Sequence, residues 1–392
     1  MAMKKNLGEE YTPTYFLAAL GNGGLAVTFY MALHFLIPHK GLPMAVFSSV
    51  QDVFSGPSIS LKILTGVALV GILVMAFRHY YMLIWNWREY LQFKKTPAYE
   101  TLKSGQQAIS ISTIPLTLAM SVNVFFILGG VFVPGLWDVV EYLFPVALVA
   151  FLLIGVYAMR VFIEFATHSL TTGTFDCSHN NSLSQMIAIF AFVMVAVGFA
   201  APAAMSTSLV TSVLGIIGSL FFLTATILFG AQQMVLGFHS MTEHGIDRKN
   251  SPSLWIIVPI MTLIGISVVR LLHGMHVNLG VHTSDGEQFA ILVVFVSIQL
   301  MFGMMGYLVM KQVGYFKEYV NGDGKIPGSY ALICPGVALN VFGMFLVHMG
   351  FIKVGLFAQF SIPHFILLAL LVYLQFKTIW VLLKLDRKLL YR

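Results

Sequence analysis

The chain has 392 residues, of which 58% are hydrophobic and 10% are charged, whereas about 25% of the residues in a soluble domain are charged. This composition excludes a soluble globular protein and indicates an integral membrane protein. The net charge of +6 gives no reason to expect a nucleic-acid partner, because a cytoplasmic excess of basic residues accounts for it.

Ten hydrophobic stretches are each long enough to cross a membrane as a helix, which requires about 20 apolar residues. The N-terminal segment before them contains Glu9 and Glu10 and no small-residue cleavage site, so it does not resemble a signal peptide. No polar segment is long enough to form a separate domain, and we expect one polytopic membrane domain over residues 1–392. The predicted spans are 14–37, 59–83, 107–131, 143–165, 185–205, 210–236, 254–275, 288–310, 330–352 and 363–384.

Positive charge predicts the orientation of these spans. If Met1 is cytoplasmic, 18 of the 22 Lys and Arg residues lie on the cytoplasmic side or at cytoplasmic helix ends. Because cytoplasmic loops are enriched in Lys and Arg, we expect a multi-pass protein of a bacterial cytoplasmic membrane with both termini in the cytoplasm. The four exceptions are Lys40, Lys62, Arg270 and Lys353.

Proline and glycine divide the spans into two alternating classes. A proline within a helix kinks it and frees a carbonyl group, which is tolerated where protein or water covers that group. Odd-numbered spans contain internal prolines or a glycine cluster, whereas even-numbered spans keep proline near their outer ends. This pattern predicts five helical hairpins, with the odd helices in an inner ring and the even helices in an outer, lipid-facing ring. The odd-span residues are Gly21, Gly23, Gly24, Pro115, Gly198, Pro202, Pro259 and Pro335; the even-span prolines are Pro57, Pro145 and Pro363.

These features resemble the tellurite-resistance/dicarboxylate transporter family, which includes bacterial TehA and the plant slow anion channels. The resemblance covers all ten spans, and locally it depends on residues 15–31 (YFLAALGNGGLAVTFYM), residues 105–120 (GQQAISISTIPLTLAM) and Cys334-Pro335. It implies an all-α membrane fold with quasi-fivefold order around a central pore, often a homotrimer, and a small inorganic anion as the transported species. It also implies a phenylalanine of the ninth span that closes the pore. The candidate pore residues are Phe342, Phe345, Asn340 and Asn123.

Histidines near the ends of the spans suggest a different function. Ionisable side chains at membrane depth are costly and rare, yet the predicted topology places these histidines in two layers, about one bilayer thickness apart. In the assumed ring, spans one, seven and nine are near neighbours, as are spans two, four and six, so each layer can offer a facing pair of imidazoles. The outer candidates are His34, His273, His276 and His348, and the cytoplasmic ones are His79, His168 and His239.

Facing imidazole pairs in two layers are suitable axial ligands for b-type haem. The seven histidines are therefore candidate metal ligands, and Arg270 and Arg78 are candidate partners for haem propionates. The chain lacks a Cys-x-x-Cys-His motif, so such haem would be bound non-covalently. This interpretation predicts two haem groups per chain that transfer electrons across or within the membrane, with a redox protein or a quinone as partner.

Simpler explanations apply to the same residues. A histidine at a membrane interface is often an amphipathic residue with a solvated tip, and Arg270 can extend to the outer surface. We expect every carboxylate except Glu164 to lie outside the hydrocarbon, so there is no carboxylate relay for proton coupling. The alternative function is a channel or exporter for small anions through the central pore. Nothing in the sequence indicates an enzyme.

Overall fold

The structure is a computed structural model that describes residues 3–39, 41–172 and 181–391. In this part of the chain ten helices are long and apolar enough to cross a membrane, which confirms the predicted number of spans. Two short helices, α2 (Phe47–Ser55) and α4 (Pro97–Ser104), lie between them. The odd-numbered spans are formed by α1 (Phe16–Leu36), α5 (Thr113–Phe132), α7 (Ile187–Met205), α9 (Ile257–Leu279) and α11 (Ile333–Phe345). The even-numbered spans are formed by α3 (Ile59–Phe93), α6 (Val140–Thr172), α8 (Leu209–His244), α10 (Asp285–Gln312) and α12 (Ile362–Leu389).

Burial alternates along the chain. Measured over 18 residues of each span, the odd-numbered spans are 56–89% buried and the even-numbered spans are 11–39% buried. The even spans expose large apolar side chains such as Ile63, Leu153 and Ile227. An apolar surface of this extent would not be stable in water, so it indicates contact with lipid.

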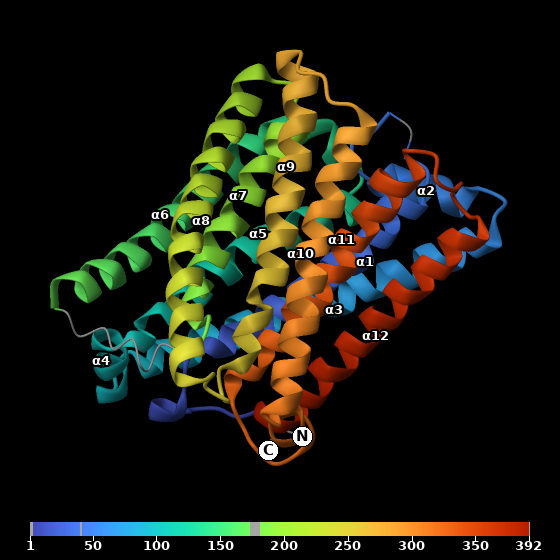
Figure 1. The fold of residues 1–392 in the computed structure, drawn as a ribbon. Coiled ribbons are helices and arrows are strands. Elements are labelled where there is room, and N and C mark those ends of the chain that lie inside the picture. Colours follow the sequence, from blue (N-terminus) through green and yellow to red (C-terminus); the bar gives the residue numbers. More distant parts are fainter. Residues whose placement is uncertain (1–2, 40, 173–180, 392) are drawn as a thin grey trace.

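The five buried helices contact one another in cyclic order. Helix α1 packs against α5, α5 against α7, α7 against α9, α9 against α11, and α11 against α1. Helices α3, α8, α10 and α12 each pack on the span that precedes them, and α6 contacts both α5 and α7 (Figure 1). Small residues allow close approach in this assembly: a Cβ atom on Gly24 of α1 would lie 2.9 Å from Val337 of α11.

Each odd-numbered span begins with a short 3-10 turn. These turns are η2 (Pro13–Tyr15), η3 (Gln106–Ser112), η6 (Ser184–Met186), η7 (Ser251–Ile256) and η9 (Pro327–Leu332). The turns contact one another in the same cyclic order as their helices. Hydrogen bonds join neighbours, since Leu183 N donates to Ser253 Oγ (2.9 Å) and Thr113 Oγ1 donates to Pro13 O (2.8 Å). We call this assembly the turn ring.

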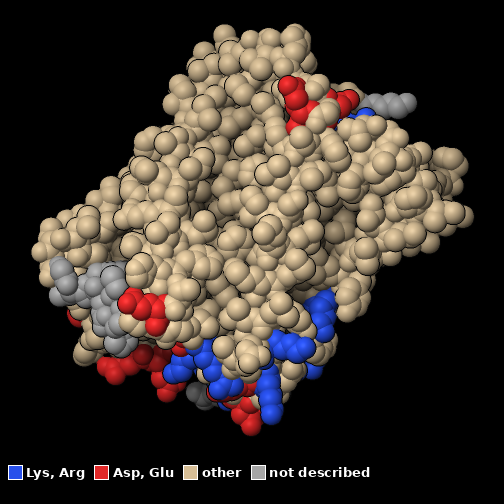
Figure 2. Space-filling view, viewed as in Figure 1, with Lys and Arg blue, Asp and Glu red and all other residues tan. Residues whose placement is uncertain are grey.

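The turn ring lies at the end of the bundle that holds both chain termini. Lys4 N donates to Leu390 O (2.8 Å), and Figure 1 shows the N- and C-termini side by side. Figure 2 shows most charged side chains of that face gathered at this end, below a broad uncharged belt. The chain therefore crosses the apolar belt an even number of times.

Several helices extend beyond the predicted spans. Helix α3 continues to Phe93, so His79 lies in the middle of a helix, and the expectation that it marks a helix end is wrong. Glu89 and Asp386, which we expected in polar segments outside the spans, lie buried near the ends of α3 and α12. Cys177 lies outside the described residues.

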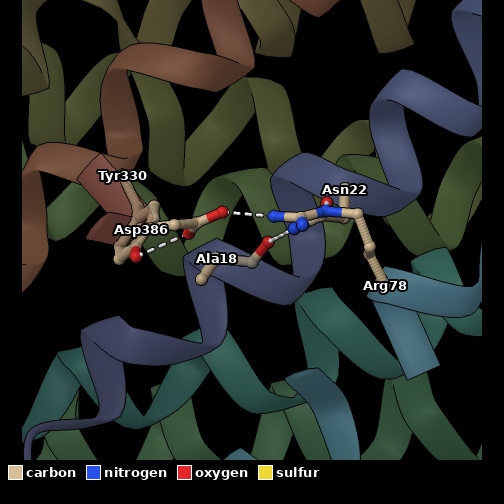
Figure 3. A network of polar contacts seen from close by, with 5 residues as sticks. All are labelled: Ala18, Asn22, Arg78, Tyr330 and Asp386. Atoms are coloured by element: carbon tan, nitrogen blue, oxygen red, sulfur yellow. Dashed lines mark hydrogen bonds and ion pairs between the residues drawn. The ribbon is translucent and has the colours of Figure 1, made fainter. Parts of the chain in front are cut away.

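A buried polar network connects the first and last spans (Figure 3). Arg78 of α3 forms an ion pair with Asp386 of α12, and its Nε donates to Asn22 Oδ1 of α1 at 2.8 Å. Tyr330 of η9 donates its hydroxyl to the other carboxylate oxygen of Asp386 (2.8 Å). The Asp386 side chain is 2% exposed and that of Arg78 is 22% exposed, so each charge depends on the other for compensation.

We expect Asp386→Ala to destabilise the protein by about 3 kcal/mol, because removing one partner leaves a buried charge without compensation. The double variant Arg78→Met/Asp386→Leu removes both charges and should recover most of that loss. Thermal unfolding midpoints of the detergent-purified proteins measure both effects. Equal losses in the single and double variants would show that the ion pair does not explain the stability of this contact.

Candidate functional site

A central cavity of about 350 Å³ lies between the five buried helices. Its lining includes residues of α1, α5, α7, α9 and α11 and part of α6. Along α9 the lining extends from Pro259 to His273, which corresponds to about 21 Å at 1.5 Å per residue. Small-molecule sites have volumes of about 300–1,000 Å³, so the cavity is large enough for an organic ligand.

The cavity is closed at one end. Near the turn ring its lining residues are buried: Leu20, Met120, Phe190, Pro259 and Cys334. At the opposite end Pro43 and His273 are exposed. The described conformation therefore has a mouth at the end away from the chain termini and is sealed at the other end.

The walls of the cavity are mainly apolar. Among the described residues, Arg270 is the only Lys, Arg, Asp or Glu that lines it. Thioether and aromatic side chains form much of the remaining wall. They are Met31, Met44, Met120, Met194, Met205 and Met349, with Tyr30, Phe126, Trp137, Phe144, Phe151, Phe190 and Phe345.

Arg270 lies well inside α9 and faces the cavity, so the alternative in which it extends to the outer surface is wrong. Its Nη1 donates to Val197 O of α7 at 3.1 Å. No carboxylate in the described ranges lies within ion-pair distance of the guanidinium. This group has five N–H donors and stays protonated at every physiological pH, so it can bind an anion in the cavity.

The predicted outer histidines separate into three groups. His34 and His273 line the cavity, and His34 Nδ1 is buried without a hydrogen-bond partner. His276 is exposed, and its Nδ1 lies 2.9 Å from Val281 O. His348 lies outside the cavity lining and contacts His364 of α12 instead.

The contact between His348 and His364 is a direct imidazole–imidazole hydrogen bond. Their Nε2 atoms are 3.1 Å apart, with ring centroids at 5.0 Å. His364 Nδ1 accepts from Phe360 N, and His348 Nδ1 lies 2.9 Å from Met344 O. These partners assign a donating Nε2–H to His364 and an accepting Nε2 to His348. Both rings are neutral in this arrangement, and no space for a planar macrocycle separates them.

The predicted cytoplasmic layer does not provide a facing pair. His79 is fully buried, with Nδ1 2.8 Å from Ala19 O of α1 and Nε2 2.8 Å from Ser121 Oγ of α5. His168 and His239 are exposed on α6 and α8, and His239 pairs with Glu243 at 3.4 Å. Arg78, a candidate partner for a haem propionate, is occupied by Asp386. The described imidazoles therefore do not fit a pair of axial ligands, and the haem hypothesis stays a prediction without geometric support.

Two of the four candidate pore residues line the cavity. Phe345 and Asn123 contribute to its wall, whereas Phe342 and Asn340 do not. Phe342 is fully buried against Gly265 of α9, and its ring lies 6.2 Å from that of Phe295. Asn340 Nδ2 donates to Leu371 O of α12 at 2.8 Å. The prediction that Phe342 and Asn340 face a pore is therefore wrong.

Tyr30 and Cys334 also line the cavity, although no sequence pattern marked either as a site residue. Helical spacing could have found the cavity-facing side of α1, because residues three and four apart share a face. That face comprises Leu20, Gly21, Gly24, Val27, Tyr30, Met31 and His34.

Comparison of the chain with protein-family models, with curated proteins and with solved structures gave no match. The resemblance to the TehA-like family therefore stays a prediction.

We expect His79→Ala to lower the thermal unfolding midpoint, because it removes the contacts that hold α3 to α1 and α5, without removing any visible absorption band. Spectra of the oxidised and dithionite-reduced proteins check the second outcome. The control is His168→Ala, which changes an exposed side chain. A Soret band in the parent protein that His79→Ala abolishes would establish His79 as a haem ligand instead.

Proposed function

We propose that the chain is a transport protein through which a small anion passes by way of the central cavity, with Arg270 as the anion-binding residue. The proposed architecture is five helical hairpins in a quasi-fivefold, two-ring bundle, distantly related to the TehA-like family. The cyclic contacts among the odd-numbered spans and the alternation of burial support this architecture. The proposed location is a bacterial cytoplasmic membrane with both termini in the cytoplasm, which the positive-inside bias supports.

The observation that carries this proposal is a guanidinium group in an apolar cavity without a carboxylate partner. An uncompensated charge in a low-dielectric interior costs several kcal/mol, and ionisable groups at membrane depth commonly mark an ion or substrate pathway. Two other partly buried basic side chains are compensated. Arg78 forms an ion pair with Asp386, and Lys388 Nζ donates to the carbonyl oxygens of Glu318 and Tyr319. An anion that enters through the mouth would supply the missing charge.

The electrostatic setting of the cavity favours the same class of ligand. Helices α1, α5, α7, α9 and α11 all begin at the turn ring, so their N-termini converge toward the closed end of the cavity. A helix N-terminus has a positive potential equivalent to about half an elementary charge. Arg270 and this potential act in the same direction along the cavity axis. Passage to the cytoplasm requires the turn ring to open.

We expect Arg270→Gln to reduce chloride or nitrate flux into proteoliposomes at least tenfold, whereas Arg270→Lys, which keeps the charge, should retain part of the activity. The control is Lys353→Gln, which removes one positive charge outside the cavity at the same end of the bundle. Thermal unfolding midpoints verify that each variant folds. Equal flux in the Arg270→Gln and parent proteins would refute the role of Arg270.

Phe345 and Phe342 provide a second, matched comparison. Phe345→Ala should raise anion flux several-fold, because it removes a side chain from the cavity wall. Phe342→Ala should leave flux unchanged and lower stability by about 3 kcal/mol, since it creates a void between α9 and α10. The same flux and unfolding measurements check both. Higher flux in Phe342→Ala than in Phe345→Ala would place the constriction at Phe342.

A further inference from the structure

We infer that the anion favoured by this cavity is an amphiphilic organic monoanion, with one carboxylate bound at Arg270 and an apolar body against the methionine-rich wall. This inference rests on the proposed function and specifies its substrate class. Charge, hydrogen-bonding capacity, volume and the position of Arg270 each support it.

The charge of the site matches a single negative charge. Among the described lining residues Arg270 is the only permanent cation, so a dianion would retain one uncompensated charge against apolar walls, which is unfavourable. The two lining histidines lie near the mouth, where His273 is exposed. A monocarboxylate is neutralised by one guanidinium and can accept two parallel N–H bonds from it.

The other polar groups of the wall offer little to a strongly hydrated ion. Asn123 Nδ2 points to the sulfur of Met194 at 3.7 Å. Thr262 Oγ1 donates to Ala338 O (3.1 Å) and accepts from Gln299 Nε2 (2.6 Å). An ion such as phosphate or sulfate would lose its hydration shell without replacement over most of the cavity, and that loss is costly.

The volume indicates a body larger than an inorganic ion. The cavity measures about 350 Å³, more than twice the apolar cavity of about 150 Å³ that stays free of water and binds benzene in another protein. A small ion would occupy only part of this volume. Water would have to fill the rest, and apolar walls do not retain water well. Methionine side chains are flexible and polarisable, and they adapt to apolar ligands of different shapes.

The position of Arg270 divides the cavity into two parts. Arg270 lies toward the mouth end of α9, and the lining continues along this helix to Pro259, a rise of about 16 Å between the two backbone positions toward the closed end. Met120, Met194 and Cys334 line the cavity on the side of the closed end. A ligand with its carboxylate at Arg270 would therefore extend its apolar chain toward the turn ring.

The direct test measures binding of straight-chain carboxylates from acetate to octanoate to the full-length protein in lipid nanodiscs, by Trp fluorescence or thermal shift. Affinity should rise about fourfold for each added methylene group that becomes buried. Alcohols and dicarboxylates of the same chain length should bind at least tenfold more weakly than the monocarboxylates. Arg270→Gln should abolish the preference for the carboxylate, and the control variant Lys353→Gln should keep it.

A second readout reports how far the chain reaches. In a Cys177→Ser background, octanoate should slow the alkylation of Cys334 by N-ethylmaleimide, whereas acetate at equal occupancy should not. Equal protection by both ligands would contradict insertion of the chain toward the closed end.

The outcomes separate this inference from the proposed function. If chloride flux depends on Arg270 but carboxylate affinity does not change with chain length, the amphiphilic substrate is refuted and the anion pathway stands. If alcohols bind as tightly as carboxylates, the acidic group is not recognised and the inference fails. If neither flux nor binding changes in Arg270→Gln, both proposals fail.

Discussion

The cost of an unpaired charge or polar group in an apolar interior governs the organisation of this protein. Arg78 is compensated by Asp386, Glu89 accepts backbone N–H groups of Asn6 and Leu7, and both nitrogens of His79 are hydrogen-bonded. These contacts also connect distant segments of the chain, so the charged and polar groups whose burial is unfavourable also stabilise the packing of the bundle. Arg270 departs from this rule: it donates to Val197 O, but no carboxylate in the described structure balances its charge, and it faces a cavity. The charged groups Arg78 and Glu89 obey this rule, so the exception at Arg270 supports the proposed function.

Cyclic packing of five helices explains why a cavity exists at the centre. Packed helices have axes about 8–10 Å apart, so five in a closed ring lie roughly 7–8.5 Å from the centre, whereas the backbone cylinder has a radius of only about 2.3 Å. Side chains must fill the remaining space. On α1, Gly21 and Gly24 place no side chain there and face Ile333 and Val337 of the neighbouring helix. Neighbouring helices can therefore pack closely while space remains open at the axis of the ring.

The sequence predicted the number of spans and the alternation of buried and exposed helices, because both depend on local composition. It did not predict where the helices end. Hydropathy identifies the residues that lie in the hydrocarbon, and a helix can continue beyond them, as α3 does through Glu89 to Phe93. Arg270 was a candidate partner for an anionic group, but the direction of its side chain depends on α7, which supplies the Val197 carbonyl. The pairing of histidines failed for the same reason. His348 pairs with His364 through a backbone turn at Phe360, and His79 is occupied by Ala19 and Ser121, partners that only the folded chain brings together.

The two ends of the cavity differ in construction, and under the proposed function this difference determines where an anion pathway opens. At the mouth the wall includes the loop residue Pro43 and the exposed His273, so entry requires little rearrangement. At the closed end five 3-10 turns meet, joined by a few side-chain hydrogen bonds such as that between Leu183 and Ser253. A 3-10 turn has poorer hydrogen-bond geometry than an α-helix, so separating these turns costs less than unwinding the helices behind them. The positive potential of the five helix N-termini also becomes accessible to an anion when they separate. Under the proposed function, the turns that close the cavity are therefore also the part whose open state an approaching anion would stabilise.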